Sequence, residues 1–299
     1  MDSSNIIKFI KLLRPHQWIK NVVVFVGIIF AKHFYNVDDW ILAALCAGAF
    51  CLISSACYIM NDFKDIKQDQ MHPIKKNRPL ASGSVSKPSA ILLMIALTTA
   101  SLGTAWHVGQ NVFFVIAGYG LLQILYTFIL KHQVIIDVIC IATGFVLRAI
   151  AGALAIDVRI SPWLIICVFC LCLFLGFCKR FCEIRTMSER QSSSHRKNLI
   201  EYKPDFLVHL ITISATIAVI AFLVYSTHAE TIARFGTIGL AYTLPLVIYC
   251  ICRASMLSMA GAYSDPTTMI ISDRPLQIAA VIWWLVVVAL ITLNSTQGN

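Results

Sequence analysis

The sequence predicts an all-helical membrane protein with nine transmembrane helices. The chain is 58% hydrophobic and only 13% charged, so it is far more apolar than an average globular domain. Its apolar runs are long enough to cross a bilayer core of about 30 Å, which takes roughly 17 to 25 helical residues. A backbone crosses lipid only as a helix or a closed barrel, and these runs lack the alternation of polar and apolar residues that barrel strands require.

The nine predicted spans leave little room for a soluble domain. They are residues 18–34, 41–60, 88–107, 111–130, 134–156, 161–180, 206–227, 232–252 and 275–293. Apolar and basic residues are interspersed in the segment 1–17, before the first span. This pattern predicts an amphipathic helix on the membrane interface. The longest polar stretches, 61–87 and 179–205, are predicted to be loops. We therefore expect residues 1–299 to form a single transmembrane domain.

Basic residues predict how the chain is oriented. Lysine and arginine gather in the N-terminal segment and in every second loop, whereas the alternate loops hold only Lys32, Arg159 and Arg234. By the positive-inside rule, the basic side is cytoplasmic, so the N-terminus lies inside and the C-terminus outside. The net charge of +9 follows from this bias. It favours anionic lipid headgroups and phosphorylated substrates as partners and does not imply nucleic acid.

An acidic motif follows the second predicted span. At about 100° per residue, Asn61, Asp65 and Asp69 lie on one face of a helix. Asp62 lies beside them. Crowded carboxylates repel one another, whereas their hard oxygen atoms suit Mg²⁺, which also takes water and substrate phosphates as ligands. We therefore expect a Mg²⁺ site here, with the basic residues just downstream on phosphate oxygens. A solvated loop between two spans is the alternative.

Polar residues also crowd the start of the first span, where Gln17, Lys20 and Asn21 surround Trp18. Interfacial anchoring accounts for the tryptophan. It accounts less well for three polar neighbours at one helix end, which favour a share in a phosphate or lipid-headgroup site.

Charged residues lie inside or at the end of two later spans. Asp137 and Arg148 are eleven residues apart on a similar face of one predicted helix. A charge there costs about 2.5 to 3.5 kcal/mol, so both side chains should line a wet cavity or join a structural ion pair. Lys179 and Glu183 lie at i and i+4 at the end of the sixth span. Either they form a surface salt bridge, or Glu183 binds metal while Lys179 and Arg180 bind phosphate.

These motifs together resemble the UbiA-type intramembrane prenyltransferases. The first of them, Asn-Asp-x-x-Asp-x-x-x-Asp, covers residues 61–69. Over nearly the whole chain, the likeness is to the decaprenyl-phosphate phosphoribosyltransferase branch of that family. The motifs similar to this branch are His72-Pro73-x-Lys75-x-x-Arg78-Pro79, Arg14-Pro15-x-Gln17-Trp18-x-Lys20-Asn21, Tyr126-x-x-x-Leu130-Lys131, Gly144-Phe145-x-x-Arg148-Ala149-x-Ala151-Gly152 and Lys179-Arg180-x-x-Glu183. The pairs Gln70-Met71 and Lys76-Asn77 depart from its pattern.

The resemblance implies nine helices around a cavity open to the cytoplasm, in a bacterial inner membrane. The implied reaction moves 5-phosphoribose from phosphoribosyl pyrophosphate to a polyprenyl phosphate with Mg²⁺, toward the arabinofuranose donor of cell-envelope glycans. We assign Asp62, Asp65 and Asp69 as catalytic residues. The expected metal ligands are Asn61, Asp65, Asp69 and Glu183, and the expected substrate-binding residues are Gln17, Lys20, Asn21, Lys75, Arg78, Tyr126, Lys131, Asp137, Arg148, Lys179 and Arg180.

Three other functions compete with this one. A prenyltransferase would move a polyprenyl chain from its pyrophosphate to an aromatic or lipid acceptor, but such relatives carry a second aspartate-rich motif where this chain has the basic stretch around Lys179. A transporter would concentrate polarity at the bilayer midplane rather than at one face. A structural scaffold would not need clustered carboxylates. The sequence leaves open the acceptor chain length, the number of metal ions and whether the chain forms a homo-oligomer.

Overall fold

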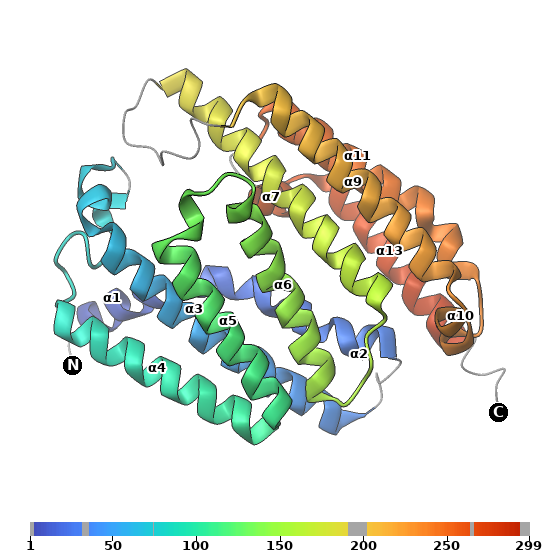
Figure 1. Ribbon diagram of the computed structural model, residues 1–299, viewed down its shortest axis with the longest axis horizontal. Helices are drawn as coiled ribbons and strands as arrows, with labels where there is room; N and C mark the ends of the chain where they lie inside the picture. The colour runs from blue at the N-terminus through green and yellow to red at the C-terminus, as the bar shows by residue number, and fades with distance from the viewer. Residues whose placement is uncertain (1–2, 32–35, 74, 191–201, 264–265, 294–299) are drawn as a thin grey trace. The chain divides into compact units, whose positions relative to one another are not determined.

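The structure is a computed structural model that describes residues 3–31, 36–73, 75–190, 202–263 and 266–293. Every regular element in this part of the chain is a helix, so the predicted all-α class is confirmed (Figure 1). The elements are α1 (Ser3–Leu13), η1 (Pro15–Phe25), α2 (Val26–Ala31), α3 (Val37–Met71), η2 (Lys75–Asn77), α4 (Lys87–Val108), α5 (Gln110–Phe128), η3 (Leu130–His132), α6 (Ile136–Ala155), α7 (Pro162–Arg190), α9 (Pro204–Thr227), α10 (Ala229–Phe235), η4 (Gly239–Thr243), α11 (Leu244–Ala260), α12 (Pro266–Ser272) and α13 (Arg274–Leu293).

Seven helical segments of the described chain are long and apolar enough to cross a membrane. They are α3, α4, α5, α6, α7, α9 and the stretch Gly239–Ala260 that joins η4 to α11. The apolar part of α13, Arg274–Leu290, is shorter. The first predicted span, 18–34, begins as the 3₁₀ segment η1 and continues as the short helix α2.

The predicted span 232–252 has wrong boundaries. The helix α10 ends at Phe235 and is followed by Gly236, whose φ of 70° lies in the left-handed region. Glycine enters this region without steric cost, which is why it often follows a helix C-terminus. A new helical stretch starts at Gly239, and Pro245 stands in the first turn of α11, where its missing N–H is not needed.

Helix α3 continues well beyond the predicted span 41–60. It runs to Met71, so the acidic motif is helical, as its periodicity predicted, and only the boundary of the predicted loop 61–87 is wrong, by eleven residues. Nothing in the motif breaks a helix until Pro73, which disfavours helical backbone at the residue before it. Helix α7 likewise extends to Arg190, so the start of the predicted loop 179–205 is helical. The acidic side chains therefore project from a rigid element.

Residue contacts divide the chain into two compact units, residues 1–140 with 144–160 and residues 141–143 with 161–299. In the first unit, α3 packs against α1, η1, α4 and α5. The approach of α6 to η1 in this unit depends on glycine, because a Cβ on Gly152 of α6 would lie 1.9 Å from the carbonyl oxygen of Val24. Only a hydrogen atom fits at that crossing of α6 over η1, and the close approach lets Asn21 in the middle of η1 reach α6.

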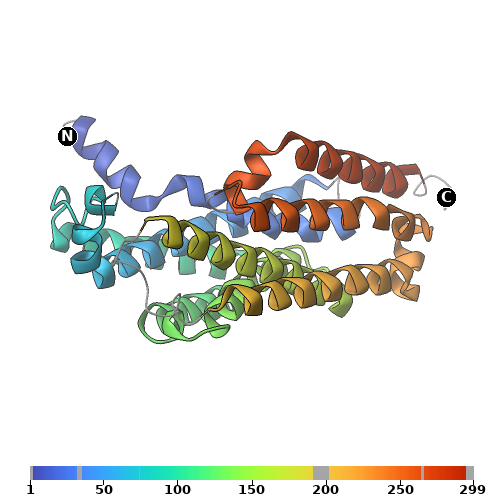
Figure 2. The same cartoon turned by 90° about the horizontal axis from the view of Figure 1, so that it is seen from above.

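In the second unit, α7 packs along α9, and α11 packs along α13 (Figure 2). An ion pair ties α11 to the start of α13: Arg253 donates to Asp273 Oδ1 at 3.2 Å and to Oδ2 at 2.9 Å. Asp273 also accepts the backbone N–H of Leu276 at 2.9 Å and so caps the helix. These hydrogen bonds lower the pKa of Asp273 below its ordinary value, and those from the Arg253 guanidinium have the larger effect. The pair explains why a carboxylate opens the last apolar helix.

Candidate functional site

The less buried part of the acidic motif joins Asn61, Asp65 and Lys131. The Asn61 amide donates to Asp65 Oδ2 at 3.0 Å, one turn away on α3. Lys131, which is 3% exposed and belongs to η3 after helix α5, donates to Asp65 Oδ1 at 2.7 Å. Asp65 therefore holds two neighbours through its two oxygen atoms, and one of them is a buried cation from a different element.

The more buried part of the motif joins two carboxylates to two arginines. Arg78 donates to Asp69 Oδ2 at 2.6 Å and to Asp62 Oδ1 at 3.1 Å. Arg14 also pairs with Asp62, and its guanidinium lies over the Tyr58 ring at 5.1 Å from the ring centroid. Arginine suits this role because its planar donors can serve two carboxylates at once. The turn after α3 and the end of α1 are thereby tied to the same face of α3.

The cluster is close to electroneutral. Its three carboxylates, Asp62, Asp65 and Asp69, face three cations, Arg14, Arg78 and Lys131. Charges removed from water this far are tolerated only when they are paired. Among the described residues, no group of three or more His, Cys, Asp or Glu side chains is arranged to hold a metal ion. The carboxylates approach basic groups instead of one another.

The donor atoms nevertheless fit Mg²⁺. They are hard carboxylate and amide oxygens on one helical face, which Mg²⁺ prefers, and the ion takes its remaining ligands from water and substrate phosphate. Apart from the Asn61 amide, the partners that now hold the carboxylate oxygens are the cations Arg14, Arg78 and Lys131. Asn61 and Asp65 are the members best placed to receive a metal, because both stay partly exposed.

A second polar site surrounds Arg148 of helix α6. Its guanidinium donates to Asn21 Oδ1 at 2.7 Å, to the Gly144 carbonyl at 2.8 Å and to the Tyr119 hydroxyl at 2.8 Å. All three acceptors are electrically neutral. The cation also lies 4.7 Å from the centroid of the Tyr119 ring and near the rings of Phe50 and Phe145. Since Arg148 is only 5% exposed, its charge is compensated by dipoles and ring faces, which leaves it attractive to an anion.

The sequence placed Asp137 and Arg148 on a similar face of one helix, and the structure gives them different partners. Asp137 is fully buried in the first turn of α6, where Oδ1 accepts the Val138 N–H at 2.9 Å. Arg148 is instead held by η1 and α5 through Asn21 and Tyr119. The described contacts of Arg148 include no ion pair. Hydrogen bonds to neutral groups stabilise this cation in α6 instead.

Four further predicted site residues belong to the first unit: Gln17, Lys20, Lys75 and Tyr126. Gln17 and Lys20 are partly exposed on η1, whose Trp18 is anchored to α3 by a 3.1 Å hydrogen bond to the Ser55 hydroxyl. Lys75 is exposed on η2, and Tyr126 is partly exposed on α5. The structure thus brings Arg78 and Lys131 onto the acidic motif and Asn21 onto Arg148, and it leaves Lys75 at the surface.

Three predicted residues belong to the second unit. On α7, Arg180 is buried and its guanidinium pairs with Glu183 at 2.5 Å, an i,i+3 spacing. The sequence had suggested a pair between Lys179 and Glu183 at i,i+4, and the observed spacing differs. The metal-ligand role of Glu183 stays a prediction.

Sequence reasoning missed two side chains at these sites. Arg14 was quoted in a motif and not assigned to the site, although it pairs with Asp62. Tyr119 lies in an apolar run, and nothing in its surroundings along the chain signals that its hydroxyl meets Arg148. The position of Arg14 directly before Pro15, at the end of an amphipathic helix, was the available signal for the first of them.

Comparison with known sequences gives consistent matches over most of the chain. The model of the UbiA prenyltransferase family matches residues 21–257. Decaprenyl-phosphate phosphoribosyltransferase of Mycolicibacterium smegmatis is 31% identical over 284 residues, which cover 92% of this chain and 89% of the relative. The protein with the same description from Corynebacterium glutamicum is 32% identical over 282 residues, covering 92% of this chain and 83% of the relative.

Comparison with solved structures finds a similar fold. A UbiA homologue from Archaeoglobus fulgidus, solved with GPP and Mg²⁺ bound, superposes with a TM-score of 0.74 at 19% identity. The match covers 95% of this chain and 99% of that protein. At this identity, the likeness concerns the fold.

Proposed function

Because the chain belongs to the UbiA prenyltransferase family, we propose that it transfers 5-phosphoribose from phosphoribosyl pyrophosphate to a polyprenyl phosphate and releases pyrophosphate. The observation that supports this most strongly is the 31–32% identity to decaprenyl-phosphate phosphoribosyltransferases over 92% of the chain. The residues add independent support, because a donor with phosphate groups at both ends of its ribose needs many cations. The two polar sites of the first unit supply Arg14, Arg78, Lys131 and Arg148.

The acidic motif would hold the metal that serves the donor's pyrophosphate. Mg²⁺ supplies charge neutralisation on the leaving group and so makes pyrophosphate easier to expel. Asn61, Asp65 and Asp69 offer the oxygen ligands, with Asp62 beside them. The arginines that now pair with Asp62 and Asp69 would turn to the phosphate oxygens as the carboxylates turn to the metal, so that every charge stays matched. Glu183 is proposed as a further ligand.

The chemical step is a substitution at C1 of the ribose. The bond from C1 to the pyrophosphate oxygen breaks while a polyprenyl phosphate oxygen forms a new bond to C1 from the opposite face, with inversion. The attacking phosphate is already an anion, so the step requires no general base. What the chain supplies is alignment and positive charge. Correct alignment of two reactants is worth about 7 to 11 kcal/mol.

The remaining basic residues are proposed to bind phosphate groups. We assign Lys131, Lys179 and Arg180 to the 5-phosphate of the donor. Lys20, Lys75, Arg78 and Arg148 are assigned to the pyrophosphate or to the acceptor phosphate. Gln17, Asn21, Tyr126 and Asp137 would orient these groups, as Asn21 already does for Arg148.

The proposal also includes the placement in the membrane. The seven apolar helical segments, together with η1–α2 and α13, would make nine crossings of a bacterial inner membrane. The basic bias of the loops puts the acidic motif and the mouth of the cavity on the cytoplasmic side, where a water-soluble donor is available.

Two labelled donors separate this function from its nearest rival. Purified protein in lipid nanodiscs would receive Mg²⁺, polyprenyl phosphate and either phosphoribosyl pyrophosphate labelled in the ribose or a labelled prenyl pyrophosphate. We expect lipid-soluble label only from the ribose donor. Label transferred only from the prenyl donor, to an aromatic or lipid acceptor, would show that the chain is a prenyltransferase of the ordinary kind.

A further inference from the structure

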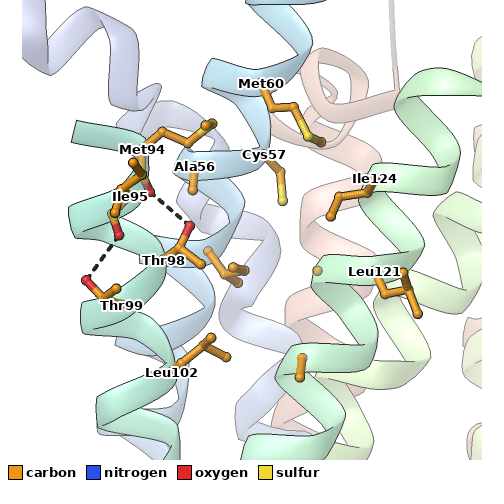
Figure 3. Close-up of a pocket in the computed structure, with 13 residues that line it drawn as sticks. Ala56, Cys57, Met60, Met94, Ile95, Thr98, Thr99, Leu102, Leu121 and Ile124 are labelled. Atoms are coloured by element: carbon orange, nitrogen blue, oxygen red, sulfur yellow. Dashed lines mark hydrogen bonds between the residues drawn. The ribbon is translucent and has the colours of Figure 1, made fainter. Parts of the chain in front are cut away.

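An apolar groove lies between α3, α4 and α5 in the first unit (Figure 3). Its volume is about 430 Å³, within the range of roughly 300 to 1,000 Å³ that small-molecule sites occupy. Buried Ile53 and Ala56 of α3 form its floor. Its rim is exposed and consists of Ile95 and Thr99 on α4 and Leu121 and Ile124 on α5. The groove therefore opens on the outer side of the helices.

The wall on α4 offers no free polar group. The Thr98 hydroxyl donates to the Met94 carbonyl at 2.9 Å, and the Thr99 hydroxyl donates to the Ile95 carbonyl at 3.1 Å, as the dashed lines in Figure 3 show. Both threonines thus satisfy their hydroxyls within their own helix. A chain of hydrocarbon fits this lining better than any polar ligand.

One end of the groove reaches the acidic motif. Met60 lines the groove and is followed directly by Asn61. One turn further along α3, the Lys64 ammonium lies 5.3 Å from the centroid of the Phe128 ring. Phe128 in turn stands one helical turn beyond Ile124, on the same side of α5. The apolar lining is therefore continued by an aromatic ring and ends at an exposed cation.

We propose that this groove holds the isoprenoid chain of the polyprenyl phosphate, with its phosphate at the Lys64 end. The inference rests on the proposed function and adds to it where the acceptor lies. A long hydrocarbon chain with one anionic end has the same order of features as the groove, which runs from apolar floor to aromatic ring to cation. An acceptor in this position would bring its phosphate toward Asn61 and Asp65 along α3, where the donor's pyrophosphate is bound.

Glycine positions on α5 provide a matched pair of variants. A Cβ on Gly120, which lines the groove, would meet only Ile53 atoms at 3.7 and 3.8 Å, so a larger side chain can be built there and will fill the groove. Gly118 is exposed two residues earlier, and a Cβ there would meet nothing within 4 Å. Gly120→Leu and Gly118→Leu change helix propensity equally, and only the first obstructs the groove.

The test compares acceptors that share a phosphate and differ in chain length. For Gly120→Leu we expect the ratio of kcat/KM for a long polyprenyl phosphate to that for a short one to fall about tenfold or more, the scale of discrimination by an apolar pocket. Gly118→Leu should keep the wild-type ratio. An unchanged ratio in an active Gly120→Leu variant would overturn the groove as the acceptor site. Absence of ribosyl transfer with every acceptor would instead overturn the proposed function.

A second measurement uses the wild-type chain and needs no variant. A polyprenyl phosphate with a photoreactive group in its hydrocarbon chain should crosslink to peptides of α4 and α5 that line the groove. An excess of unlabelled polyprenyl phosphate should prevent the crosslink, and inorganic phosphate should not. Crosslinks confined to other helices would contradict the inference. Equal competition by an ordinary anionic phospholipid would show a site for bilayer lipid and would also contradict it.

Discussion

Asp65→Asn is expected to leave the protein folded and to reduce Mg²⁺-dependent ribosyl transfer by at least about 10²-fold, the scale on which one preorganised electrostatic group acts. Asparagine has the same shape, and its one oxygen atom can still accept from Lys131. Its NH2 group can donate to the Asn61 oxygen once the Asn61 amide turns over, so a hydrogen bond to that neighbour can be formed again. What it lacks is the negative charge that binds a divalent cation. Because the substitution also leaves the buried Lys131 cation without its carboxylate, the unfolding temperature should fall as well, and the loss of catalysis should be much larger than this loss of stability explains.

The measurement is kcat/KM for phosphoribosyl pyrophosphate, together with the thermal unfolding temperature in detergent. Asp38→Asn is the matched control, because it makes the same chemical change in the exposed first turn of α3. The control should behave like the wild-type protein in both measurements. Near-normal turnover by Asp65→Asn would remove the acidic motif from the mechanism.

Arg148→Gln is expected to lower kcat/KM by about 10² to 10³-fold, with Arg148→Lys between it and the wild-type protein. The reason is that Arg148 is a buried cation whose acceptors are all neutral, so its charge is available to a phosphate group in a low-dielectric site. Lysine restores the charge and lacks the planar set of donors that binds Asn21 and Tyr119 together.

Tyr119→Phe distinguishes a role in anion binding from a purely structural one. It removes one hydrogen bond from the guanidinium and leaves the charge in place. If Arg148 binds phosphate, Tyr119→Phe should reduce activity far less than Arg148→Gln, even if both variants unfold at similarly reduced temperatures. Equal losses of activity and of stability in the two variants would mean that the network matters only for the fold.

The sequence predicted the helical class and most of the apolar helices because their length and composition follow directly from the thickness of a bilayer. It also predicted that Asn61, Asp65 and Asp69 share a face, because this depends only on helical periodicity. The helical motif follows from the same periodicity, and the end of α3 could have been predicted as well, since Pro73 is the first residue after the motif that opposes a helix. We placed a loop there because polar residues usually follow a membrane span.

The partners of the site could not be predicted. Asp65 meets Lys131 across 66 residues, and Arg148 meets Asn21 across 127 residues. Such contacts depend on how helices cross, and crossings depend on small residues such as Gly152 that carry no chemical signal. The sequence identified the charges on each helix, and the structure showed that Asp62, Asp65 and Asp69 are each matched by a basic group.

The most direct test of the account is a calorimetric titration of phosphoribosyl pyrophosphate into the purified protein, with Mg²⁺ and then with a chelator. We predict binding that requires Mg²⁺ and that Asp65→Asn loses. Equal affinity for the donor with and without Mg²⁺, or no affinity in either case, would contradict the claim that the carboxylates of α3 hold a metal for the donor's pyrophosphate.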